Sequence, residues 1–181
     1  MTEQLSAKDW LDRGLKTLAK SGFTALKAEP LAKAMGVSRG SFYWHFADIG
    51  AYRAAILAHW REVMAEQVIA ELETMPNSED ALALLLRRAF SARLALERAV
   101  RSWATVDPDA RAAVHAVDQR RIGYIESLLR QAGFSEDVVR GRAQIFYWAF
   151  IGFALSDQAQ PKARQEAALD ELLRMARRPL S

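Results

Sequence analysis

Residues 31–46 read LAKAMGVSRGSFYWHF, and this stretch holds the strongest indication of fold in the 181-residue chain. Ala32, Gly36 and Phe42 have the spacing of a helix-turn-helix. In that motif a small residue lies where two helices cross, a glycine makes the tight turn and an apolar residue anchors the second helix. Phe42 and Phe46 are four residues apart, so both should point inward, which leaves the neighbouring side chains on an outward surface.

Helical periodicity continues on both sides of this stretch, and no run alternates with period two between turn residues. We therefore expect an all-α chain of about nine helices. Their predicted ranges are 7–21, 28–35, 39–46, 49–74, 79–104, 108–117, 118–132, 136–157 and 162–178. Cap and turn residues mark their ends, among them Ser6 with Asp9, Gly22, Asp107 with Pro108, and Gly133.

Composition excludes several classes of protein. With 51% hydrophobic residues the chain is globular rather than disordered, and without cysteine it has no disulfides, thiolate zinc site or cysteine nucleophile. The three histidines lie far apart and no catalytic motif is present, so we expect neither a metal site, a cofactor nor an enzyme. The N-terminus lacks the apolar core of a signal peptide, and the run Ile145–Leu155 is too short to cross a bilayer, which favours a cytoplasmic protein without a membrane partner.

The run from Gly36 to Phe46 closely resembles the recognition helix of TetR-family transcriptional regulators, and the resemblance extends in sequence detail over about residues 7–60. It implies a three-helix DNA-binding domain over residues 1–48, a connecting helix over 49–76, and a C-terminal domain over 77–181. The implied C-terminal domain binds a small ligand and forms a homodimer through the last two helices.

The resemblance also implies contacts with double-stranded DNA. Tyr43 and His45 look like phosphate contacts, Arg39, Ser41 and Trp44 like base-edge or adjacent backbone contacts, and Gly40 would allow close approach to the groove. Ser38 can cap the recognition helix and leave its first turn facing phosphates.

Two positions depart from the family pattern. Lys27 replaces the usual threonine and can still meet a phosphate, whereas Ile49 replaces a lysine and cannot. The departures predict a weaker operator affinity or a shifted phosphate footprint.

The C-terminal part carries two further predictions. The run from Ile145 to Leu155 is apolar around its whole circumference, so a partner subunit is its simplest cover. Amphipathic rings suitable for an apolar ligand cavity are Trp103, His115, Tyr124, Tyr147 and Trp148. Each of these residues has an equally good interpretation as an ordinary core or interface side chain.

Together these features predict a ligand-responsive transcriptional regulator, a repressor that binds a palindromic operator as a dimer and is released by an unknown small molecule. A second hypothesis is a helical small-molecule-binding protein or enzyme with a vestigial helix-turn-helix. A third is a DNA-binding activator or architectural protein without a ligand.

Overall fold

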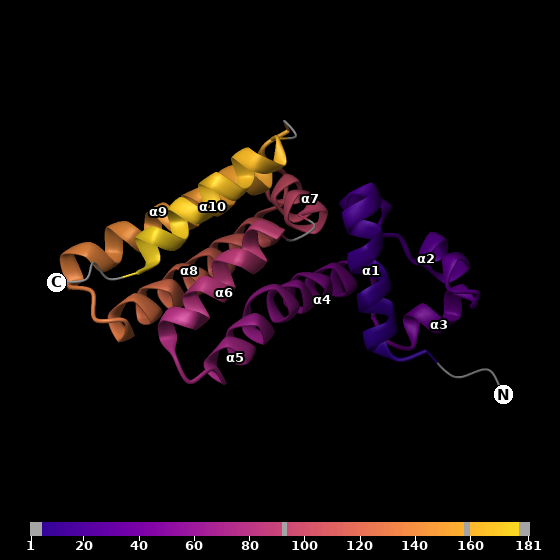
Figure 1. Cartoon of the computed structure of the whole chain (residues 1–181). Coiled ribbons are helices and arrows are strands. Elements are labelled where there is room, and N and C mark those ends of the chain that lie inside the picture. Colours follow the sequence, from indigo (N-terminus) through magenta and orange to yellow (C-terminus); the bar gives the residue numbers. More distant parts are fainter. Residues whose placement is uncertain (1–4, 92–93, 158–159, 178–181) are drawn as a thin grey trace. The chain divides into compact units, whose positions relative to one another are not determined.

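The computed structural model describes residues 5–91, 94–157 and 160–177, and the chain in these ranges is helical with no strand (Figure 1). The all-α prediction is confirmed, and these ranges contain nine α-helices when the unbroken stretch Ile49–Glu73 counts once, besides a short 3-10 helix at Phe23–Ala25. The α-helices are α1 (Ala7–Ser21), α2 (Ala28–Ala34), α3 (Arg39–Tyr43), α4 (Ile49–Arg61), α5 (Gln67–Glu73), α6 (Ser78–Ser91), α7 (Ala95–Ala104), α8 (Pro108–Gln131), α9 (Glu136–Leu155) and α10 (Lys162–Ala176). None of the helices described here combines the length and the apolarity that a bilayer span requires.

Local chemistry fixes several helix ends where the sequence predicts them. At the start of α1 the Ser6 hydroxyl accepts from the Asp9 N–H (3.2 Å), and the Asp9 carboxylate accepts from the Ser6 N–H (2.8 Å), which completes a capping box. The helix ends at Gly22, whose φ of +75° is strained for any residue with a Cβ. The Asp107 carboxylate accepts from the Ala110 N–H (2.9 Å) and caps α8.

The long helix predicted from residue 49 to residue 74 is present as α4 and α5, joined by a π-helical turn at Glu62–Glu66. Buried side chains in α4 recur four residues apart at Tyr52, Ile56 and Trp60, but the next buried residue, Ala65, follows after five. A π turn inserts one residue into the helical register, which accounts for that longer interval. The connecting segment is therefore one continuous helix whose buried face is reset at the π turn.

The single helix predicted over residues 79–104 is wrong, because α6 ends at Ser91 and α7 begins at Ala95. The sequence between them contains neither glycine nor proline. The break accompanies a change of packing partner: Leu86 of α6 is buried in the core of one compact unit, and Trp103 of α7 is buried in the other. The helix propensities of the residues between α6 and α7 do not indicate this break.

The two helices predicted at 108–117 and 118–132 are also wrong, because the chain forms one helix, α8, over the whole interval. Asp118 resembles a helix start in the sequence. In the structure its carboxylate accepts a hydrogen bond from the Tyr147 hydroxyl, so it does not compete for backbone N–H groups.

The helices form two compact units. The first contains the described residues up to Met64 together with Leu94–Ala116, so that α7 and the start of α8 belong with α1 to α4. The second contains the remaining described residues. The functional boundaries expected after residues 48 and 76 stay predictions.

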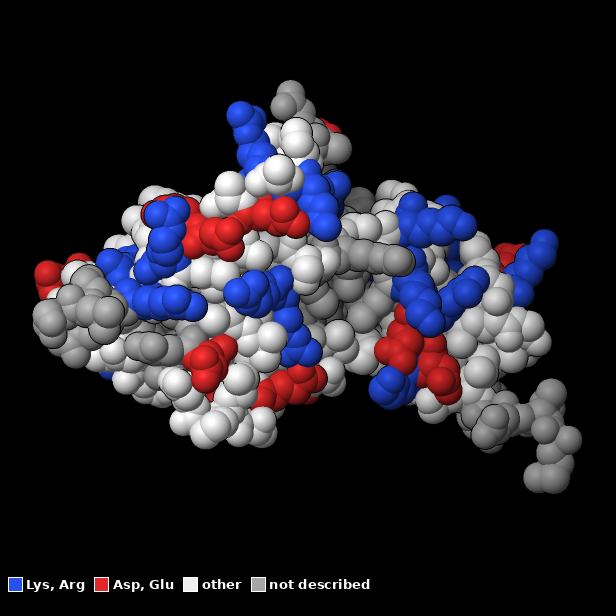
Figure 2. All heavy atoms as spheres, viewed as in Figure 1, with Lys and Arg blue, Asp and Glu red and all other residues white. Residues whose placement is uncertain are grey.

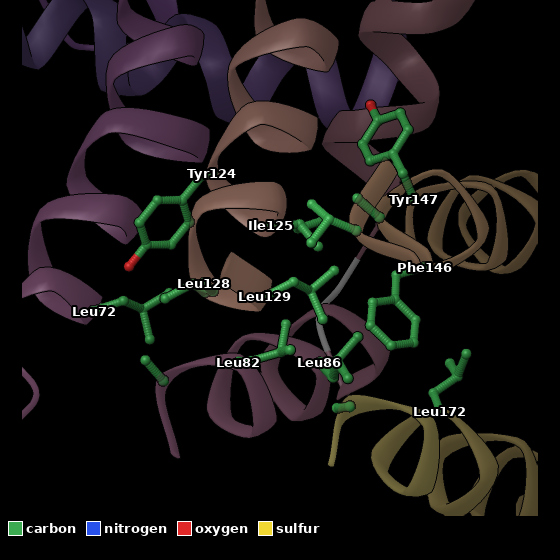
Figure 3. Packing of buried hydrophobic residues seen from close by; sticks show 14 of the residues in the cluster. Leu72, Leu82, Leu86, Tyr124, Ile125, Leu128, Leu129, Phe146, Tyr147 and Leu172 are labelled. Atoms are coloured by element: carbon green, nitrogen blue, oxygen red, sulfur yellow. The ribbon is translucent and has the colours of Figure 1, made fainter. Parts of the chain in front are cut away.

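The second unit has one continuous apolar core, drawn in Figure 3, to which α5, α6, α8, α9 and α10 all contribute. Its members include Leu72, Leu82, Leu86, Ile125, Leu129, Phe146 and Leu172. Within this unit α10 packs along α6, which brings the last of the described helices beside the first helix after the connecting segment.

Candidate nucleic-acid interface

A glycine turn joins α2 to α3. The N–H of Gly36 donates to the Lys33 carbonyl (3.2 Å), and the N–H of Val37 donates to the Ala32 carbonyl (3.1 Å). Gly36 has a φ of +70°, in the left-handed region that favours glycine. The predicted helix-turn-helix is therefore present, with the predicted residue in the turn.

An aromatic cluster anchors α3. Phe42 is fully buried, and its ring centroid lies 5.4 Å from that of Trp10, 5.1 Å from that of Tyr52 and 5.3 Å from that of Phe46. The Tyr52 hydroxyl donates to the Trp10 carbonyl (2.7 Å), which ties α4 to α1 behind the cluster. The inward placement of Phe42 and Phe46 is confirmed, and packing rather than propensity holds so short a helix in place.

The opposite side of α3 faces outward. Trp44 is 85% exposed and Tyr43 45% exposed. Arg39 is also exposed, and its Nη2 donates to the Tyr43 hydroxyl oxygen (3.1 Å) while its guanidinium carbon lies 5.5 Å from the centre of the Tyr43 ring. These two contacts, four residues apart on the helix, hold the arginine over the tyrosine.

The ends of α3 differ from the prediction. Ser38 occupies the N-cap position with extended backbone, but its hydroxyl accepts no capping hydrogen bond, so the predicted side-chain cap is wrong. The helix ends at Tyr43 instead of Phe46, because the N–H groups of His45 and Phe46 both return to the Phe42 carbonyl in a closing turn.

The remaining predicted DNA contacts differ in exposure. Lys27 is exposed at the N-cap of α2, and Gly40 is exposed, whereas Ser41 and His45 are half-buried. Ile49 is the first residue of α4 and is half-buried, so its apolar side chain offers nothing to a phosphate. On the face drawn in Figure 2, Lys and Arg are interspersed with Asp and Glu, so this face carries no single large basic field.

The five residues predicted to line a ligand cavity have different environments. In the first unit, Trp103 is buried with its ring stacked on Phe23 (5.6 Å between centroids), and His115 is exposed. In the second unit, Trp148 is 66% exposed, whereas Tyr124 and Tyr147 are buried with their hydroxyls pointing apart (Figure 3). Their assignment to a ligand site stays a prediction.

The second unit contains a cavity that the sequence did not suggest. It has a volume of about 410 Å³ and lies among α6, α9 and α10. Its lining residues are Phe90, Ala149, Phe153, Gln160, Arg164, Gln165, Ala168, Glu171 and Leu172. Within α9 and α10 the lining residues recur three or four positions apart, as on one face of any helix, but the sequence does not show which helix faces meet to form the cavity.

Solved structures share this fold over nearly the whole chain. A TetR/AcrR family member is 22% identical, with a TM-score of 0.81, and the alignment covers 94% of this chain and 97% of that one. AibR, solved in complex with isovaleryl coenzyme A and operator DNA, is 15% identical with a TM-score of 0.67 over 93% and 96% of the two chains. The superantigen PfiT is 20% identical with a TM-score of 0.71 over 96% and 97%.

The match to a known protein family is confined to the N-terminal part of the chain. No curated protein matches the chain. Residues 11–56 match the family described as bacterial regulatory proteins, tetR family, and this range contains the whole helix-turn-helix together with Phe42, Phe46 and Tyr52 of its aromatic anchor, while Trp10 lies just before it. The resemblance is therefore confirmed: residues 11–56 match the tetR family of bacterial regulatory proteins, and the chain shares the fold of a solved TetR/AcrR family member.

Proposed function

We propose that the protein is a ligand-responsive DNA-binding repressor, which binds a palindromic operator as a homodimer and is released by a small molecule. The observation that carries this proposal is the outward surface of α3, where Arg39, Tyr43 and the C-cap residue Trp44 are exposed and the helix is anchored from behind by Phe42. An exposed apolar and cationic face on so well anchored a helix suits insertion into a major groove.

The Arg39–Tyr43 contact favours a shared role at a phosphate. Because the tyrosine oxygen accepts from Arg39, its own O–H proton remains available to donate to a phosphate oxygen. A charged donor polarises that O–H group, and hydrogen bonds with an ionised partner are the stronger kind. In this role Arg39 and Tyr43 form one contact, while His45 contacts a neighbouring phosphate and Trp44 meets a base edge or a thymine methyl group.

Dimerisation is supported by the outward face of α9. Gly141, Ile145, Trp148, Gly152 and Leu155 lie alternately four and three residues apart, and the three large side chains are 46%, 66% and 43% exposed in chain order. A Cβ at either glycine would meet nothing within 4 Å, so the packing of the chain itself requires neither. Each glycine costs about 1 kcal/mol relative to alanine inside a helix, and a closely approaching partner helix would explain both.

Two observations support the ligand response. AibR, which has this fold, was solved with both a coenzyme A thioester and operator DNA, so one such fold can hold both. In the present chain α7 packs on α1 within the first unit, where the Trp103 ring stacks on Phe23. A ligand that favours one position of α7 would therefore bias α1 and the helix-turn-helix packed on it.

The test is binding of the purified full chain to duplex DNA from its own promoter, measured by fluorescence anisotropy in moderate salt. Tyr43→Ala and His45→Ala should each weaken binding about tenfold, the loss expected for one hydrogen bond to a charged group. Arg39→Ala should weaken binding similarly, whereas the control Arg177→Ala, which removes an exposed arginine of the C-terminal part, should not. Every variant should keep the wild-type sedimentation coefficient.

Two results would overturn the proposal. Equal affinity for promoter and random duplex would remove the role in DNA recognition, and sedimentation as a monomer at micromolar concentration would remove the dimer. The fold also occurs in the superantigen PfiT, so it does not by itself choose a regulator. Tight ligand binding or turnover without any response of DNA binding would select the second hypothesis, a helical binding protein or enzyme.

A further inference from the structure

The cavity among α6, α9 and α10 has apolar walls. Phe90 and Phe153 stack against one another with centroids 5.0 Å apart and planes 28° apart, and Ala149 and Leu172 continue the wall. The volume of about 410 Å³ lies in the range of small-molecule sites, about 300 to 1,000 Å³. Because the two rings already touch, a ligand would lie along them rather than between them.

The rim of the cavity is polar and carries a positive charge without a counter-ion. Arg164 Nη1 donates to the Gln160 side-chain oxygen (3.5 Å), and the Gln165 side-chain amide donates to the Gln160 backbone carbonyl (2.9 Å). No carboxylate of the described residues forms an ion pair with Arg164, whereas Glu171 on the same rim is paired with Arg174. The rim therefore offers one guanidinium that is free to bind an anion.

These features limit the chemistry of a ligand. An apolar wall favours a hydrocarbon or aromatic body, at about 25 cal/mol for each Å² removed from water. A planar guanidinium matches a carboxylate with two parallel hydrogen bonds. The nearby Glu171 disfavours groups with two or more negative charges.

From these observations we infer that the cavity among α6, α9 and α10 binds a small apolar carboxylate, with the hydrocarbon part along Phe90 and Phe153 and the carboxylate on Arg164. The site deepens the ligand response proposed above, and its regulatory consequence rests on that proposed function. It is separate from the aromatic residues Trp103, Tyr124 and Tyr147, none of which lines the cavity.

The probe is octanoate below its micelle concentration, titrated into the full chain by isothermal calorimetry. Octan-1-ol and octylammonium have the same chain with no charge or the opposite charge. Octanoate should bind at least tenfold more tightly than octanol, and octylammonium should not bind. Arg164→Gln should weaken octanoate binding about tenfold to a hundredfold, as expected for a hydrogen-bonded charge, and leave octanol unchanged.

Filling the cavity provides an independent variant. Ala168 lines the cavity and is exposed, so Ala168→Phe can be accommodated on α10 while its ring occupies the site. Octanoate binding should be lost in Ala168→Phe. The matched controls are Ala167→Phe, one residue away and outside the lining, and Arg177→Gln on the same C-terminal segment, and both should bind octanoate as the wild type does.

Several outcomes would overturn the inference. These are no octanoate binding, equal binding of octanoate and octanol, or octanoate binding that survives both Arg164→Gln and Ala168→Phe. If the wild type does not bind octanoate and the Ala168→Phe variant sediments as a monomer, a second copy of the chain fills the cavity instead. Operator binding of the same proteins, measured in the absence of octanoate, tests the proposed function separately. A wild type that does not bind the operator refutes the proposed regulator. A wild type that binds the operator but not octanoate refutes only this ligand site.

Discussion

Gly14 offers a sharp test of how α1 and α4 pack in the first unit. It is buried in α1, where a Cβ would overlap Ile56 Cδ1 and the Tyr52 hydroxyl and would lie 3.1 Å from Tyr52 Cζ. The isoleucine methyl group can rotate away. The tyrosine ring cannot move so easily, because Phe42 and Phe46 pack against it and its hydroxyl donates to the Trp10 carbonyl.

The expected effect of Gly14→Ala follows from three contributions. Alanine in place of glycine inside a helix gains about 1 kcal/mol. Overpacking a filled core costs about 1 to 3 kcal/mol, and loss of the buried Tyr52 hydrogen bond costs about 1 kcal/mol more. The net change is a loss of about 1 to 3 kcal/mol in the free energy of unfolding, although the substitution favours the helix itself.

Urea unfolding followed by tryptophan fluorescence suits this measurement, because Trp10, Trp60 and Trp103 are all buried in the first unit. The matched control is Gly123→Ala in α8, where a Cβ would meet nothing within 4 Å and the same substitution should stabilise by up to about 1 kcal/mol. Because Gly123 lies in the second unit, its unfolding is followed by far-UV circular dichroism, which reports on all helices. Both proteins are compared with the wild type at equal concentration. A Gly14→Ala protein as stable as the wild type or more stable would refute this account of the packing.

Two further predictions concern a helix cap and a DNA contact. The hydrogen bond from the Ala110 N–H holds the pKa of Asp107 below its usual value of 3.8, so its contribution to stability is complete at neutral pH and is lost as pH falls through the lowered pKa. Asp107→Asn keeps a hydrogen-bond acceptor at the cap but removes the titrating carboxyl group. Urea titrations give the difference in unfolding free energy between the wild type and this variant. The difference should be constant from pH 7 to about pH 5 and shrink below about pH 4. Under the proposed function, Ile49→Lys should add one contact with a DNA phosphate. In anisotropy titrations, the slope of the logarithm of the DNA-binding constant against the logarithm of the salt concentration should then become steeper by about one. An unchanged slope would show that the start of α4 does not reach the DNA.

The sequence predicts best those structural features that depend on residues close together in the chain, such as helix caps and helix ends. The capping box of Ser6 with Asp9, the glycine ends and the Asp107 cap all depend on residues a few positions apart, and each is present as predicted. The inward placement of Phe42 and Phe46 is likewise a matter of helical spacing. The same spacing rule could also have paired Arg39 with Tyr43, four residues later, but that contact was not predicted.

Features that depend on tertiary partners were not predictable in the same way. The break before Ala95 follows from which core receives each helix, and the continuity of α8 through Asp118 depends on a hydroxyl 29 residues further along the chain. The cavity residues come from α6, α9 and α10 and the loop before α10, and helical spacing within each helix does not show which faces meet. Ser38 shows the limit of cap prediction: the residue is at the N-cap, yet its hydroxyl makes no cap.

The aromatic anchor and the charge of the chain together determine what kind of DNA binding the proposed function requires. A net charge of only +3 gives little attraction to DNA in general, so affinity must come from a few well-placed groups on and beside α3. The placement of those groups depends on Phe42, which is fully buried and fixes the helix against Trp10 and Tyr52. A chain with more basic charge could tolerate a loosely held recognition helix, whereas this one cannot, so the buried cluster is as much a determinant of operator recognition as the exposed side chains.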